Sequence, residues 1–323
     1  MKSLYTLLYA LSIALINPWG ISRGLIWTAP KVLIIFLIVA LNLSIIGERS
    51  KSLTISRHGK ISLMLWGLFL TIGGISTLRS PFPLTSFLGQ DQMGDGWLYW
   101  LLIATFTLSN TLLLKRHPEW ARSQFLGLII GGIVLALSTL PQLIDWRIDY
   151  TATMGQIIRP DVNASSIFQG QQPIGLYSHR GHAAIALATI TLISLIGWLF
   201  QLTGARLTAL TLMTIAPALI FTSTRSAILG LAVALCYKLG HKYRQLILGV
   251  ILISALVLFS MTVTRPLNWN QPSIGQIMSS RSPLWGLSLR GIKKRPFFGW
   301  GFDGFGIAYP YIRNPKKTPI VVN

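Results

Sequence analysis

Long runs of apolar residues, separated by short polar breaks, dominate the pattern along the chain. About nine runs approach the roughly 20 residues that cross a bilayer core. They cover residues 3–19, 30–47, 61–78, 97–114, 124–144, 182–200, 206–222, 226–239 and 244–263. Because lipid offers the backbone no hydrogen-bond partners, spans must be helices or closed barrels, and the runs lack a barrel's period-two alternation. The pattern predicts an all-α, polytopic transmembrane bundle of about nine spans over residues 1–263.

The weakest part of this assignment is the pair of runs between residues 206 and 239. The polar string Thr222-Ser223-Thr224-Arg225 interrupts what is otherwise one long apolar stretch. The run after it is short enough to be a half-helix or a tilted helix inside the bundle. At the other end of the bundle, the run after Met1 and Lys2 has no small-residue cleavage site, so we interpret it as a first membrane helix.

Composition supports a membrane protein. Hydrophobic residues make up 52% of the 323 residues and charged residues only 11%, against roughly 25% charged in soluble proteins. The net charge of +20 could suggest nucleic-acid binding. The charges lie in breaks between apolar runs, however, and form no soluble basic domain, so no nucleic-acid partner is expected. The single cysteine, Cys236, excludes an intrachain disulfide or a cysteine metal cluster.

Loop charges predict the orientation, because short cytoplasmic loops are enriched in Lys and Arg. With the N-terminus in the cytoplasm, the cytoplasmic breaks hold Arg49, Lys51, Arg57, Lys60, Lys115, Arg116, Arg122, Lys238, Lys242 and Arg244. The opposite breaks hold Asp91, Asp95, Asp145, Asp149 and Asp161. Two outer segments result, a loop at 145–181 and a tail at 264–323, which we expect to carry short helices. The basic residues of the tail oppose the bias, so a role other than topology should explain them.

Two sets of residues near the predicted outer surface could bind an anion. Arg225 lies between apolar stretches beside hydroxyl side chains, and a charge near membrane depth indicates function; alternatively it snorkels to lipid headgroups. His179, Arg180 and His182 open the run at 182–200. A helix N-terminus favours anions, and a histidine there could act as a general base. The alternative is an ordinary polar helix start. As a metal site the pair is weak, because no third ligand completes it.

The tail provides the third candidate. Residues 281–292 have the pattern of an amphipathic helix, with Arg281 and Arg290 among its polar positions. Such a helix could simply lie on the membrane with its basic residues toward lipid phosphates. The glycine-rich turn that follows contains Trp300, which could stack on a sugar, and Asp303. The alternative role for Asp303 is to cap the turn.

Three strings in this order resemble the O-antigen ligase and O-antigen polymerase family. They are PIGLYSHRGHAA, STRSAILGL and R-x-x-LW-x-x-x-LRGI-x-x-RP-x-x-GWG-x-x-x-F. The resemblance covers roughly residues 60–310, and its tail string is the most specific. Members are glycosyltransferases of the bacterial plasma membrane. They transfer a glycan from undecaprenyl diphosphate, on the periplasmic side, to lipid A core or to another glycan, and no cofactor is implied.

The resemblance also implies residue roles. Arg225 matches the membrane arginine that holds the donor diphosphate, and Arg281 matches the arginine that opens the tail string. His179, Arg180 and His182 occupy a loop where the family often has Asn. The family's loop normally continues past GWG and supplies a histidine that activates the acceptor, whereas no histidine follows His241 here. We expect either a fragment or truncated member, or another residue in that role, for which His179 and His182 are the candidates.

Two other functions remain open at this point. A transporter or flippase for an anionic lipid-linked glycan would be expected to show internal repeats and ionisable groups near mid-bilayer, and the sequence shows no repeat. An inactive truncated homologue would fold without transferring anything. Ligase and polymerase differ in their acceptor, and both remain possible.

Overall fold

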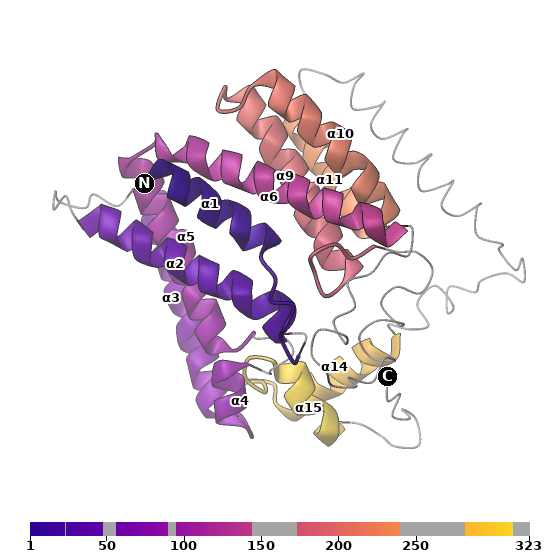
Figure 1. Ribbon diagram of the computed structural model, residues 1–323. Coiled ribbons are helices and arrows are strands. Elements are labelled where there is room, and N and C mark those ends of the chain that lie inside the picture. Colours follow the sequence, from indigo (N-terminus) through magenta and orange to yellow (C-terminus); the bar gives the residue numbers. More distant parts are fainter. Residues whose placement is uncertain (23, 48–55, 90–94, 144–172, 240–281, 313–323) are drawn as a thin grey trace, which may run out of the picture. The chain divides into compact units, whose positions relative to one another are not determined.

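The computed structural model describes residues 1–22, 24–47, 56–89, 95–143, 173–239 and 282–312. Within these residues every regular element is a helix (Figure 1). The helices are α1 (Lys2–Ala14), the π-helical turn η1 (Gly24–Thr28), α2 (Ala29–Gly47), α3 (Arg57–Leu78), α4 (Pro83–Leu88), α5 (Trp97–Arg116), α6 (Trp120–Leu143), α9 (Arg180–Leu199), α10 (Ala205–Phe221), α11 (Arg225–Leu239), α14 (Ser282–Lys294) and α15 (Gly304–Ile312). The all-α prediction is confirmed for the part of the chain described.

Among the described residues, five helices are long and apolar enough to cross a membrane, so the chain is a membrane protein by the length and composition of its helices. They are Gly24–Gly47, Arg57–Leu78, Trp97–Arg116, Trp120–Leu140 and Arg180–Leu199. Helices α1, α10 and α11 occupy three more predicted spans but have only 13, 17 and 15 residues. The predicted span at 244–263 lies outside the described residues. The nine-span arrangement therefore stays a prediction.

The chain divides into two compact units. Unit 1 comprises Met1–Ile38 and Leu113–Leu267, and unit 2 comprises Val39–Leu112 and Asn268–Asn323. Each unit therefore combines an earlier and a later part of the sequence. The described residues of the tail belong to the same unit as α3 and α4.

In unit 1, α6 packs against α1, α9 and α10. Two glycines of α6 allow the α1 backbone to approach closely. A Cβ on Gly127 would lie 2.4 Å from the Thr6 carbonyl oxygen, and one on Gly131 would lie 2.6 Å from that of Ala10. Small residues at such contacts are the usual means of packing helices in lipid. The core beyond them includes Leu135, Leu187 and Ile215, which are fully buried.

The loop before α9 is not helical, and a side chain from α6 binds its backbone. Gln142 Oε1 accepts hydrogen bonds from the backbone N–H of Ile174 and of Gly175, both at 2.9 Å. Its Nε2 donates to the Gly175 carbonyl at 3.2 Å. Gly175 has φ +58°, a left-handed conformation that suits glycine. One glutamine thus supplies the partners that a helix would have supplied to this backbone.

In unit 2, the tail forms a helical hairpin. Helices α14 and α15 pack through Leu287, Ala308 and Ile312, and Lys294 Nζ donates to the Tyr311 carbonyl at 2.6 Å. The amphipathic helix predicted at 281–292 is confirmed as α14, which begins at Ser282 among the described residues. Only one side of α14 is covered. Its other apolar side chains are more than a third exposed, namely Leu284, Trp285, Leu289 and Ile292.

Replacing Gln142 with methionine should loosen the loop before α9 without opening the core. Methionine keeps the length of the side chain but removes all three hydrogen bonds. We expect amide exchange of Ile174 and Gly175 to accelerate by at least about tenfold, given about 1 kcal/mol for each lost bond. Hydrogen–deuterium exchange with mass spectrometry measures this.

The matched control is Gln124→Met, because Gln124 also lies in α6 but donates to Tyr5 Oη at 3.0 Å instead. Equal exchange of the loop in Gln142→Met and wild type would contradict this anchoring.

Candidate functional site

Helices α9, α10 and α11 bring the predicted histidine segment and Arg225 to one end of unit 1. Only residues 200–204 join α9 to α10, and only residues 222–224 join α10 to α11. Such short links make neighbouring helices antiparallel, so α9 and α11 run in the same direction (Figure 1). Ala183 and Ala184 of α9 share a buried cluster with Ala227 and Ile228 of α11. We call residues 178–182 and 222–225, at the two helix starts, the polar end.

His179 caps α9. Its Nδ1 accepts a hydrogen bond from the backbone N–H of Gly181 at 3.0 Å. A neutral imidazole with Nδ1 as acceptor carries its proton on Nε2. The basic nitrogen of His179 is therefore occupied by the hydrogen bond from Gly181 and cannot accept a proton without breaking it. His182 follows on the first turn, exposed, with its ring 5.8 Å from that of His179. Of the two histidines, His182 is therefore better placed to accept a proton.

Arg225 is the first residue of α11 and its side chain is exposed. The turn before it is built from hydroxyl residues. Thr222 is fully buried and donates to the Leu219 carbonyl at 2.7 Å. Ser223 has φ +52°, and Thr224 Oγ1 donates to the Thr222 carbonyl at 3.3 Å. This turn sets Arg225 at the N-terminus of α11, where the charge of the side chain and the helix dipole both favour an anion.

Lys31 fixes the backbone that leads into the polar end. Its Nζ donates to the carbonyls of Leu15, Trp27 and Leu176 at 3.0, 3.2 and 2.9 Å. The ammonium also lies 4.6 Å from the ring centroid of Tyr177. Three donors thus meet three carbonyl acceptors. This contact places the segment that precedes α9 on the same side of unit 1 as the link between α1 and α2, as the predicted topology requires.

In unit 2, the glycine-rich turn of the tail lies against the end of α3. We call residues 295–303 the tail loop. Ser76 Oγ of α3 hydrogen-bonds to the Phe298 carbonyl and accepts from the backbone N–H of Gly301 at 3.0 Å. Gly301 has φ +91°. A Cβ on Gly73 would lie 2.3 Å from the Phe302 ring, so the absence of a side chain there admits that ring.

Two arginines flank this contact, and each packs on an aromatic ring. The Arg79 guanidinium lies 4.2 Å from the centroid of Phe298, and that of Arg295 lies 4.9 Å from Trp300. Arg295 also donates to the Arg79 carbonyl at 2.9 Å. Neither guanidinium has a carboxylate partner within the part of the chain that the structure describes. The Arg295 guanidinium therefore lies beside the Arg79 backbone, just beyond the end of α3.

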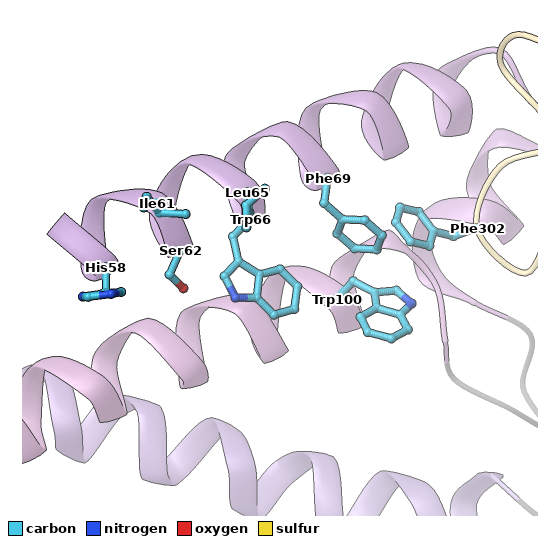
Figure 2. Close-up of a pocket in the computed structure, with 8 residues that line it drawn as sticks. All are labelled: His58, Ile61, Ser62, Leu65, Trp66, Phe69, Trp100 and Phe302. Atoms are coloured by element: carbon cyan, nitrogen blue, oxygen red, sulfur yellow. The ribbon is translucent and has the colours of Figure 1, made fainter.

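Two adjoining hollows lie along α3, on the side of these arginines that faces the start of the helix. The first, of about 760 Å³, is lined by His58, Ile61, Ser62, Leu65, Trp66, Phe69, Trp100 and Phe302. Figure 2 shows His58 at its far end and the Phe69, Trp100 and Phe302 rings together at the other. The second, of about 500 Å³, is lined by Leu65, Leu68, Phe69, Ile72, Gly73, Ser76, Phe297, Phe298, Gly299, Gly301 and Phe302. Both are apolar surfaces along a helix that is long enough to cross a membrane.

Asp303 ends the tail loop, with φ +55°. Its Oδ2 and Asp95 Oδ1 are buried, and neither has a hydrogen-bond partner among the described residues. Burial, and secondly the charge of Asp95, raise the pKa of the Asp303 carboxyl to about 6. Tertiary packing thus brings two of the chain's few acidic residues close enough to interact.

The structure places the other predicted site residues as follows. Arg180 is the first residue of α9 and half-buried, and Arg290 is half-buried on α14. Trp300 Nε1 donates to the Gly291 carbonyl at 3.0 Å, and the ring packs 5.4 Å from Tyr311, so it joins α14 to α15. Arg281 lies outside the described residues. Arg225, Arg180 and the histidines share one unit, whereas Arg290, Trp300 and Asp303 belong to the other.

Sequence reasoning missed several of these residues. Lys31 could have been found as a lone lysine near the start of an apolar run, and Arg79 as a charge directly after one. Gln142 and Ser76 carry no comparable signal. Within the described residues, no group of three or more His, Cys, Asp or Glu side chains could hold a metal ion.

Comparisons of the chain with models of protein families, with curated proteins and with solved structures found no match.

The raised pKa of Asp303 predicts a specific pH dependence of stability. Between the ordinary pKa of 3.8 and about 6, the folded state binds more protons at this carboxyl than the unfolded state does. Stability contributed by this group is therefore present at low pH and lost as pH rises to about 6. Asp303→Asn should abolish this loss, so its melting temperature should exceed that of wild type at pH 7 and approach it at pH 4. Thermal unfolding in detergent micelles measures this.

Glu119→Gln is the control, because that exposed carboxyl has its pKa lowered by a hydrogen bond to its own backbone N–H and by His117. The Glu119 carboxyl therefore affects the pH dependence of stability in the opposite direction to Asp303: the stability that it contributes should be lost as the pH falls. A pH profile of Asp303→Asn parallel to that of wild type would contradict the burial of Asp303.

Proposed function

We propose that the chain is a membrane glycosyltransferase of the O-antigen ligase or polymerase type. It would transfer a glycan from undecaprenyl diphosphate to lipid A core or to another glycan, on the periplasmic face of a bacterial inner membrane. The proposal rests on the resemblance of the three sequence strings. The structural observation that supports it best is the polar end, where the starts of α9 and α11 carry Arg180, His182 and Arg225 together.

The polar end has the groups that such a reaction needs. The acceptor hydroxyl oxygen attacks the anomeric carbon of the donor sugar, and the bond from that carbon to the diphosphate oxygen breaks. The hydroxyl proton passes to His182, and the electron pair of the broken bond stays on the diphosphate. Arg225 and the positive end of the α11 dipole stabilise this charge. Because a diphosphate is already a good leaving group, the reaction needs neither ATP nor a cofactor.

The contacts within each unit agree with the predicted sides of the membrane. In unit 1, Lys31 joins the segment before α9 to the link between α1 and α2, both predicted outside. In unit 2, the tail loop contacts Ser76 and Arg79 at the predicted outer end of α3. This supports placing the polar end and the tail on the periplasmic side.

Transport of an anionic lipid-linked glycan is the alternative. Lys31 is a buried ionisable residue in a candidate span, which is a feature of transporters. Its three carbonyl partners, however, give it a structural role, and it lies in the first third of that span. An inactive homologue is the remaining alternative.

Replacing Arg225 with alanine should lower the rate of transfer by roughly 100- to 1,000-fold, as expected when a group that stabilises developing negative charge is removed. Arg281→Ala, in the most specific string, should lower it as well. The assay uses purified protein in liposomes with undecaprenyl-diphosphate-linked glycan and candidate acceptors, and it measures released undecaprenyl diphosphate. Arg206→Ala is the matched control, because Arg206 is exposed on the first turn of α10, at the opposite end of the same three helices.

Absence of released diphosphate from wild type would refute the enzyme assignment, and movement of labelled donor across the bilayer without release would favour transport. Full activity in both Arg225→Ala and Arg281→Ala would refute the site.

Replacing each histidine in turn distinguishes the proposed general base, His182, from the helix cap, His179. His182→Gln should reduce the rate roughly 100-fold and flatten the acidic limb of the pH–rate profile, as expected for loss of a general base. His179→Asn should have a much smaller effect, because asparagine also caps helices. The opposite ranking would assign the proton transfer to His179.

A further inference from the structure

The second hollow and the two arginines above it form a binding site that the proposed transfer reaction does not use. We propose that this site holds an anionic phospholipid of the surrounding membrane. One acyl chain lies in the hollow along α3, and the phosphate lies between Arg79 and Arg295. The inference does not depend on the proposed function, because the transfer step proposed above uses neither Arg79 nor Arg295.

The first argument is the fit of the hollow to a lipid chain. Its lining is apolar from Leu65 to Ile72, and Leu65, Leu68 and Ile72 are each more than half exposed. From Leu65 to Ser76 the helix rises by roughly 17 Å at about 1.5 Å per residue. One leaflet contributes about half of a hydrocarbon core of roughly 30 Å. The hollow thus has the length of an acyl chain that starts at the interface.

The second argument is charge. A lipid chain in the hollow places its headgroup at the end of α3, next to Ser76 and Phe298. The Arg79 guanidinium lies over that same Phe298 ring, and Arg295 is bound to the Arg79 backbone. Stacking on aromatic rings holds both guanidinium groups without using up their charge. Phosphate oxygens would complete their hydrogen bonds, and no carboxylate of the described residues pairs with either arginine.

The third argument is the aromatic residue at the rim. Phe297 is 89% exposed, although it lies in a chain segment that is otherwise fixed by Ser76 and Gly301. It lines the second hollow and is the chain neighbour of Phe298, the ring on which the Arg79 guanidinium packs. An apolar ring as exposed as this loses contact with water if it inserts at the boundary between headgroups and acyl chains.

The test places a reporter in the hollow. The full chain carries Cys236→Ser, which leaves no native cysteine, and Leu68→Cys labelled with a small fluorophore. It is titrated in detergent micelles with phosphatidylglycerol or phosphatidylcholine that carry the same brominated chains, since bromine quenches only at contact. We expect phosphatidylglycerol to quench at lower concentration. Millimolar inorganic phosphate should not reverse that quenching, because the chain contributes most of the binding.

Arg79→Gln should reduce the preference for phosphatidylglycerol about fivefold, and Arg79→Gln with Arg295→Gln roughly 10- to 30-fold, from the usual contribution of a basic residue at an anionic surface. For each variant, an unchanged titration with phosphatidylcholine shows that the hollow is intact. If the double variant loses the hollow, the single variant Arg79→Gln still tests the proposal. The Arg79 side chain makes no hydrogen bond to the tail loop, so its replacement leaves the loop in place. The control pair Arg57→Gln and Lys60→Gln removes two charges from the other end of α3 and should leave the preference intact.

Several results would overturn the proposal. The first two are equal quenching by the two lipids and a preference for phosphatidylglycerol that survives the double substitution. The third is reversal of phosphatidylglycerol quenching by inorganic phosphate. The fourth is the same lipid preference at a fluorophore on Met213→Cys, an exposed position of unit 1. Displacement of phosphatidylglycerol by undecaprenyl phosphate at equal or lower concentration would overturn it in favour of a carrier-lipid site. These results are independent of transfer activity, so the two proposals can fail separately.

Discussion

Hydrocarbon offers a peptide backbone no hydrogen-bond partner, and every element described above depends on that constraint. Helices satisfy it by themselves, as do the hydroxyl side chains within them, such as Thr191, which donates to the carbonyl four residues earlier. The constraint is harder to meet where a span ends and the chain must turn. At those points, single polar side chains supply several backbone partners at once. Gln142, Lys31 and Ser76 each do this for a segment far away in the sequence.

These anchors also determine where chemistry could occur. The backbone before α9 is bound by Gln142 and Lys31, so the start of that helix, with its histidines, has a defined position relative to α6 and α2. The turn before α11 is fixed by its own hydroxyl groups. Under the proposed function, Arg225 at the start of α11 would be a preorganised anion site, because the turn that positions it need not rearrange when charge develops. The rigidity that lipid imposes on the backbone would then favour electrostatic stabilisation at the end of a span.

The sequence predicted those features that depend on local pattern. Apolar runs located the helices, the amphipathic spacing of residues 281–292 located α14, and the short links around α10 imply that Arg225 and the segment at 178–182 lie at the same end. It could not predict contacts whose partners are backbone atoms, because a carbonyl such as that of Leu176 has no sequence signature. Nor could it predict that Asp303 and Asp95 interact, because their proximity exists only after the tail packs on α3. The placement of the tail loop was missed for the same reason: Gly73 and Ser76 look like ordinary span residues.

The contact between Gly73 and Phe302 has a consequence for how this chain can change over evolutionary time. The two positions lie in distant parts of the sequence, yet the ring of one occupies the space where the other would have a side chain. A larger residue at position 73 is compatible with this packing only if position 302 becomes smaller, and the exchange at position 302 must therefore come first, or both must arise together. Related chains should therefore show the two positions varying as a pair. Such paired variation would reveal the docking of the tail on α3 from sequences alone.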